Sequence, residues 1–81
     1  MASETVARIL PIELLRKGER GVVHDLCGDD AVVHRLSEMG LRPGVEFRMV
    51  RPGSPCIVCI GEHRLTLRLD PSLQILVDVW S

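Results

Sequence analysis

The sequence of 81 residues is poor in aromatic side chains, because Phe47 and Trp80 are the only two and tyrosine is absent. Surfaces that bind single-stranded nucleic acid stack bases on aromatic rings. Grooves that bind proline-rich peptides are lined by several aromatic rings. The scarcity of such rings argues against both kinds of binding surface.

The sequence also lacks an excess of charge of either sign. Ten basic and eleven acidic side chains give a formal net charge of -1, which does not indicate a polyanionic partner. Five arginines could form a basic face, namely Arg42, Arg48, Arg51, Arg64 and Arg68. Because acidic residues offset their charge and stacking rings are scarce, we expect this face to be solvated and no nucleic acid to bind.

Long apolar runs are absent as well. No segment approaches the roughly 20 apolar residues of a membrane helix, and the N-terminus lacks the profile of a signal peptide. Three cysteines, an odd number, do not make a disulfide framework and fit a reducing compartment. A soluble, cytoplasmic chain that is not embedded in a membrane is therefore expected.

Catalytic motifs are missing too. No serine or cysteine has a recognisable base at a useful spacing, and no glycine-rich phosphate loop occurs. The chain is not expected to be an enzyme. Its length and its hydrophobic share of 46% predict one domain over residues 1–81 with a single core, with residues 1–5 disordered.

The most informative stretch, residues 36–45, predicts the end of a helix followed by a sharp turn. With Met39 as the last helical residue, Gly40 takes the position that closes a helix in a left-handed conformation. In that register Leu36 and Leu41 occupy positions whose side chains touch across such a cap. The chain should therefore be held firmly as it leaves the helix.

The next three residues, Arg42, Pro43 and Gly44, predict a tight turn. Proline favours the backbone angle of the second turn residue, and glycine supplies the positive angle of the third. Upstream, Asp29 or Asp30 is placed to cap a helix over residues 31–39. Gly40 and Gly44 are thus assigned as structural turn residues.

Alternating and β-branched patterns predict strands elsewhere. We expect five of them, over residues 21–26, 45–49, 56–60, 64–69 and 73–80. Imperfect alternation suggests a bend in the first. Residues 6–10 form an edge strand or extended arm because Pro11 excludes a central strand, and residues 11–18 form a single helical turn. The fold class is mainly β, a small bent antiparallel barrel of about five strands with one inserted short α-helix.

Cysteine and histidine provide weak candidates for a metal site. Cys56 and Cys59 form a C-x-x-C, but residues three apart in a strand point to opposite faces, which favours two structural thiols. His24 and Cys27 could approach each other at the bend in their strand. A stable zinc or iron site usually needs three or four ligands, and no third is evident.

Several segments of the sequence together resemble a known protein family. The run Arg35-Leu36-x-Glu38-Met39-Gly40-Leu41-x-Pro43-Gly44, together with Gly18, Val23, Leu26, Pro55 and the pair Leu67-Arg68, is similar to the FeoA family. The resemblance implies a Src-homology-3-like β-barrel and an accessory role in bacterial ferrous iron uptake. The implied partner is the cytoplasmic GTPase region of the FeoB permease.

The residues at the helix end are needed for the cap and the core, and they also offer a surface on which a partner could dock. The helix and its exit turn would form the surface, with Leu36, Glu38, Met39, Leu41 and Pro43 as partner-binding residues and part of Met39 or Leu41 exposed. No cofactor is required by this hypothesis. A metal carrier or sensor that binds iron or zinc through cysteine and histidine is the alternative. A homo-oligomer formed through an exposed edge strand also stays open, because the final strand is long and apolar.

Overall fold

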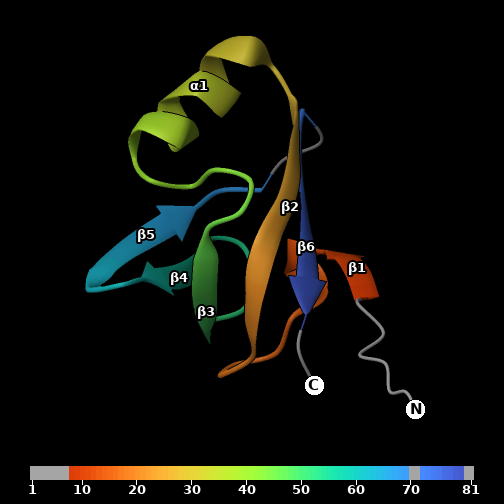
Figure 1. Cartoon of the computed structure of the whole chain (residues 1–81), viewed down its shortest axis with the longest axis vertical. Helices are drawn as coiled ribbons and strands as arrows, with labels where there is room; N and C mark the ends of the chain where they lie inside the picture. The colour runs from red at the N-terminus through yellow and green to blue at the C-terminus, as the bar shows by residue number, and fades with distance from the viewer. Residues whose placement is uncertain (1–7, 70–71, 80–81) are drawn as a thin grey trace.

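The structure is a computed structural model that describes residues 8–69 and 72–79. Figure 1 shows how its strands and α-helix are arranged. In chain order the elements are β1 (Arg8–Pro11), η1 (Ile12–Leu14), β2 (Arg20–Gly28), α1 (Asp30–Glu38), β3 (Glu46–Arg51), β4 (Cys56–Ile60), β5 (His63–Leu67) and β6 (Leu73–Val79).

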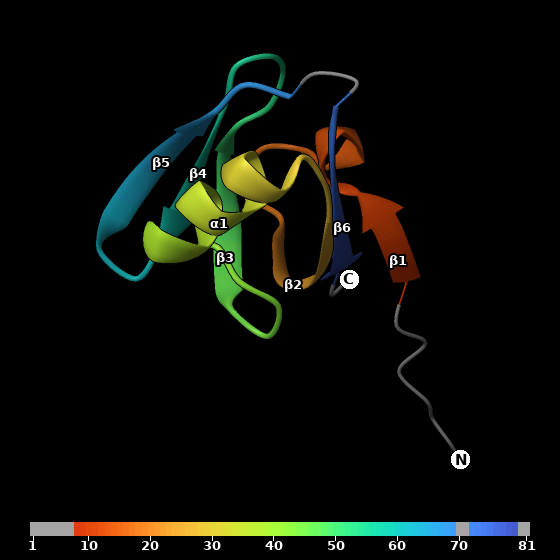
Figure 2. The same ribbon diagram turned by 90° about the horizontal axis from the view of Figure 1, so that it is seen from above.

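All six strands of the described residues belong to one antiparallel sheet in the order β1-β6-β2-β3-β4-β5. The sheet curls on itself, and α1 lies across one end of it (Figures 1 and 2). This is the mainly β, barrel-like fold with one helix that the pattern predicts. The sixth strand is β1, which the sequence left as an edge strand or an arm.

Strand β2 connects the two halves of the sheet. It pairs with β3 over its first three residues and with β6 along most of its length. The register with β6 shifts between Val23 and Asp25, which marks an irregularity of the kind that a β-bulge produces. The predicted bend is therefore confirmed, and it lies in the middle of β2, which stays paired with β6 as far as Gly28.

The core is apolar and lies inside the curl. Strand β6 shows why, since Leu73, Ile75, Val77 and Val79 alternate with more exposed residues and all four are buried. Each such side chain contributes about 1.5–3 kcal/mol when fully buried. No polar or charged residue of the described chain is buried, so the core carries no desolvation cost from such groups.

Two expectations about the strands are wrong. The final strand does not offer a free edge, because β1 pairs with β6 on the side away from β2, so the edges are β1 and β5. Strand β5 ends at Leu67, and Leu69 packs against the core from outside the strand. The proposed disorder of residues 1–5, the start of the predicted arm, and Trp80 lie outside the described residues.

Candidate functional site

Helix α1 begins at a side-chain cap. Asp29 has an extended backbone, and its Oδ1 accepts hydrogen bonds from the backbone N–H groups of Ala31 at 2.9 Å and Val32 at 3.3 Å. These two groups have no partner within the helix, so the carboxylate satisfies them and also faces the positive end of the helix dipole. Of the two aspartates considered from the sequence, Asp29 is the cap.

The other end of α1 closes as a Schellman motif. The N–H of Leu41 donates to the carbonyl of Leu36 at 2.9 Å, and the N–H of Gly40 donates to that of Ser37 at 3.1 Å. Gly40 has a φ of +103°, and the side chains of Leu36 and Leu41 are both buried. The helix end therefore has the conformation that the sequence predicts, with the hydrophobic contact positions in the core.

The exit turn is anchored to β2. The N–H of Val45 donates to the carbonyl of Arg42 at 3.1 Å, and Gly44 has a φ of +92°. Two further bonds join this turn to Val23, whose N–H donates to Val45 at 2.9 Å and whose carbonyl accepts from Gly44 at 2.8 Å. Helix end, turn and strand are thus joined by backbone hydrogen bonds into one unit.

The five residues assigned to partner binding fall into a buried pair and an exposed group of three. Leu41 is 0% exposed and Leu36 is 9% exposed, so both support the surface from beneath and offer little to a partner. Met39 is 46% exposed, and Glu38 before it and Pro43 in the exit turn are exposed as well. We call these three residues, Glu38, Met39 and Pro43, the helix rim.

The C-x-x-C motif does not bring its sulfurs together. Cys56 faces the core, where it lies opposite Leu67, and burial raises the pKa of its thiol. Cys59 lies opposite the exposed Arg64, and its thiol donates to the carbonyl of Gly61 at 3.3 Å. The opposite faces expected of a strand are confirmed.

His24 and Cys27 also have different partners. His24 Nδ1 lies 3.4 Å from Asp78 Oδ2, on the neighbouring strand. The Cys27 thiol donates to Asp25 at 3.4 Å, and this bond is the main reason why the pKa of the thiol is raised. Across residues 8–69 and 72–79 no group of three or more histidine, cysteine or acidic side chains could hold a metal ion.

Comparison with known protein families gives a decisive match. The family model described as "FeoA domain" matches residues 10–79, which is most of the chain. The chain belongs to the FeoA family. The resemblance seen in the helix-cap run is thereby confirmed, and family membership supports an accessory role in ferrous iron transport.

A solved FeoA structure shares the fold. The crystal structure of an iron uptake regulatory protein (FeoA) superimposes with a TM-score of 0.78 at 22% sequence identity, covering 89% of this chain and 99% of that one. The architecture is accordingly the small Src-homology-3-like β-barrel of FeoA structures. No curated protein matches the sequence significantly.

Within the described part of this FeoA-family chain, no helix has the length and apolar character needed to cross a membrane.

Sequence reasoning missed one surface of this FeoA-family chain. Arg20 was not among the five arginines singled out, yet it lies directly opposite Arg48 in the β2–β3 ladder. Both line an open hollow of about 760 Å³. The strand register that brings them together cannot be read from either segment alone, although Arg20 immediately precedes a predicted strand.

Proposed function

We propose that the chain is a cytoplasmic, non-enzymatic accessory protein of ferrous iron uptake. It binds the cytoplasmic GTPase region of a FeoB-type permease through the helix rim. Membership of the FeoA family supports the link to iron transport. The related crystal structure is that of a protein named for regulating iron uptake. GTP hydrolysis by the permease is one step at which such binding could act.

The exposure of Met39 is the main observation that supports docking at the helix rim. A large apolar side chain that is 46% exposed is held at the end of a capped helix, directly after exposed Glu38 and four residues before exposed Pro43. A few anchor side chains that fill pockets of the partner usually supply most of the binding energy of an interface, and an exposed apolar side chain on a fixed backbone suits that role. Methionine is unbranched and adapts to the shape of a partner pocket.

The rigidity of the rim supports the same assignment. The cap at Gly40 and the turn at Gly44 are tied to the core and to β2 by backbone hydrogen bonds, so Met39 starts from a defined position. A surface ordered before binding loses less conformational entropy when a partner docks.

Affinity capture from iron-starved cells tests this proposal. The tagged wild-type chain should enrich the permease, and Met39→Glu should lose that enrichment because a charge would be buried unpaired in the interface. Leu14→Glu is the matched control, because Leu14 is also exposed, at 62%, and lies outside the rim in η1.

Ferrous iron uptake is measured in the same strains. It should fall with Met39→Glu and stay near the wild-type level with Leu14→Glu. The proposal fails if the wild-type chain never enriches the permease while Met39→Glu leaves iron uptake unchanged.

A further inference from the structure

A row of arginines crosses the outer face of the sheet. Arg20 on β2 lies opposite Arg48 on β3, Arg48 lies opposite Cys59 on β4, and Cys59 lies opposite Arg64 on β5. Residues directly opposite each other in an antiparallel ladder project from the same face. All three arginines are exposed, and we call Arg20, Arg48 and Arg64 the arginine row.

No arginine of this row takes part in an ion pair within the described residues. In residues 8–69 and 72–79, the two ion pairs join His24 to Asp78 and His34 to Glu38, and neither involves an arginine. Like charges directly opposite each other repel, so an anionic group that contacts both Arg20 and Arg48 would be bound favourably.

Three carboxylates belong to the segments that carry the arginine row or to the turns next to them, and none forms an ion pair with it. Glu46 lines the same hollow, and Glu62 lies in the turn between β4 and β5. The third, Glu19, accepts a hydrogen bond from the backbone N–H of Arg16. None of these three carboxylates therefore forms an ion pair with the arginine row.

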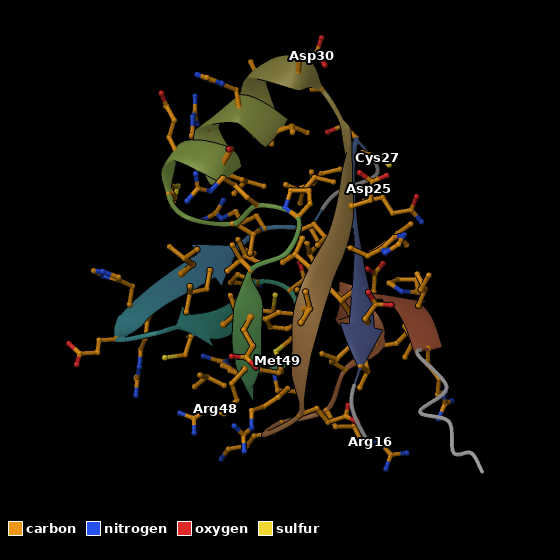
Figure 3. All side chains as sticks on the ribbon, viewed as in Figure 1. Arg16, Asp25, Cys27, Asp30, Arg48 and Met49 are labelled. Atoms are coloured by element: carbon orange, nitrogen blue, oxygen red, sulfur yellow. The ribbon has the colours of Figure 1, made fainter. Side chains whose placement is uncertain are left out.

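The surface beside the row is hollowed. Lys17, Arg20 and Arg48 line an open cavity of about 760 Å³ together with Glu46 and parts of β3 and β4. Clefts of about 300–1,000 Å³ are the usual size of ligand sites in proteins. Figure 3 shows Arg48 and Arg16 at the end of the molecule farthest from Asp30, so this surface is distinct from the start of α1.

From this geometry we propose that the arginine row binds an extended acidic segment of a partner protein. Adjacent strands are about 4.8 Å apart, so the three steps from Arg20 to Arg64 span about 14 Å. Alternate side chains of an extended peptide lie about 6.7 Å apart on one face, so carboxylates at positions i, i+2 and i+4 span about 13 Å. Such a segment crosses the strands with its outer carboxylates beside Arg20 and Arg64, and its middle carboxylate lies about 2 Å along the row from Arg48, because β4 contributes Cys59 to the row.

Two other anionic partners fit the surface less well. A bilayer is flat on this scale and would touch the edge of the hollow while leaving its floor unfilled. Nucleic acid is bound by stacking as well as by charge, and the chain has only two aromatic residues. Arginine, in contrast, matches the planar carboxylate with two parallel hydrogen bonds.

The test uses a capped peptide with the sequence Thr-Glu-Val-Glu-Val-Glu-Thr, titrated into the isotopically labelled chain and followed by NMR. Binding should shift the amide signals of residues 17–20, 46–50 and 59–64. Arg20→Gln combined with Arg48→Gln should weaken the affinity about tenfold, which corresponds to about 1.4 kcal/mol. The control is Arg8→Gln combined with Arg35→Gln, which removes the same charge from exposed sites outside the hollow. This control should change the affinity for the peptide less than twofold.

A second peptide, with the same composition but three adjacent glutamates, tests the geometry and should bind several-fold more weakly. Equal binding of the two peptides would refute the extended register. Equal effects of the two double variants would refute the site. Binding to phosphatidylserine vesicles is measured as well. If the chain binds these vesicles but not the alternating peptide, and Arg20→Gln with Arg48→Gln abolishes vesicle binding, the proposal of a protein partner is wrong and the surface binds lipid.

Discussion

Two glycines of this chain are required for different physical reasons. Gly40 needs its positive φ of +103°, but a Cβ at that position would meet no atom within 4 Å. Gly21 has ordinary strand geometry, but a Cβ there would collide with the backbone carbonyl oxygen of Asp78 on β6. Gly40 is therefore required by its backbone conformation, and Gly21 is required because two paired strands approach too closely for a side chain.

We therefore expect Gly21→Ala to destabilise the fold more than Gly40→Ala. The left-handed conformation costs about 1 kcal/mol for alanine at Gly40. At Gly21 the paired strands must move apart, and overpacking of this kind costs about 2 kcal/mol or more. Urea unfolding midpoints measure both changes. A larger loss for Gly40→Ala would contradict the close approach of β2 and β6.

Cys27 provides a second prediction at the residue scale. Its thiol donates to Asp25, and the bond and the negative charge raise the pKa of the thiol above its ordinary value. Less thiolate is then present near pH 8, and the thiolate is the reactive form. Asp25→Asn should lower this pKa and speed alkylation of Cys27 by iodoacetamide, followed by mass spectrometry. Buried Cys56 is the internal control and should stay unreactive in both proteins.

At the scale of elements, α1 depends on its ends. A helix of nine residues is too short to be stable alone, so its caps and its packing hold it. The caps could be predicted from sequence because each is a local pattern, namely an aspartate before an apolar stripe and a glycine after it. The partners of the strands are not local, which is why β6 was mistaken for a possible edge.

Removal of the N-terminal cap should measure this dependence. Asp29→Ala should lower the free energy of unfolding by about 1 kcal/mol, because two backbone N–H groups lose their acceptor. Asp30→Ala, one position later, removes a similar charge without a hydrogen bond of its own and should cost less. Thermal unfolding followed by circular dichroism compares the two, and equal losses would show that charge rather than capping matters.

The candidate sites show the same limit of sequence reasoning. The run that ends α1 could be identified as FeoA-like, and the opposite faces of Cys56 and Cys59 follow from the pleat of any strand. The burial of Leu41 and the pairing of Arg20 with Arg48 could not be predicted. Both depend on how segments distant in sequence pack against each other.

At the scale of the whole molecule, the fold separates its thiols and imidazoles. Because no three of them converge within residues 8–69 and 72–79, titration with ferrous iron or zinc under reducing conditions should show no binding tighter than that of a surface histidine. Cys56→Ser and Cys59→Ser should leave this weak binding unchanged. Stoichiometric, tight binding that either substitution abolishes would support the carrier or sensor hypothesis instead.

The whole molecule thus presents a small barrel with an apolar anchor at the end of α1, the one α-helix of the described residues. If that anchor serves the proposed function, its contribution must appear in binding to the purified partner and not only in cells. Burial of a methionine side chain contributes about 1.5–3 kcal/mol, which is more than a tenfold change in affinity.

Isothermal titration of the chain into the purified cytoplasmic GTPase region of a FeoB-type permease measures this contribution most directly. We predict saturable binding that weakens at least tenfold with Met39→Glu and changes less than twofold with Leu14→Glu. A tenfold loss of affinity corresponds to about 1.4 kcal/mol of binding free energy. Binding that is absent in the wild-type chain, or equally strong in all three proteins, would contradict the assignment of the helix rim.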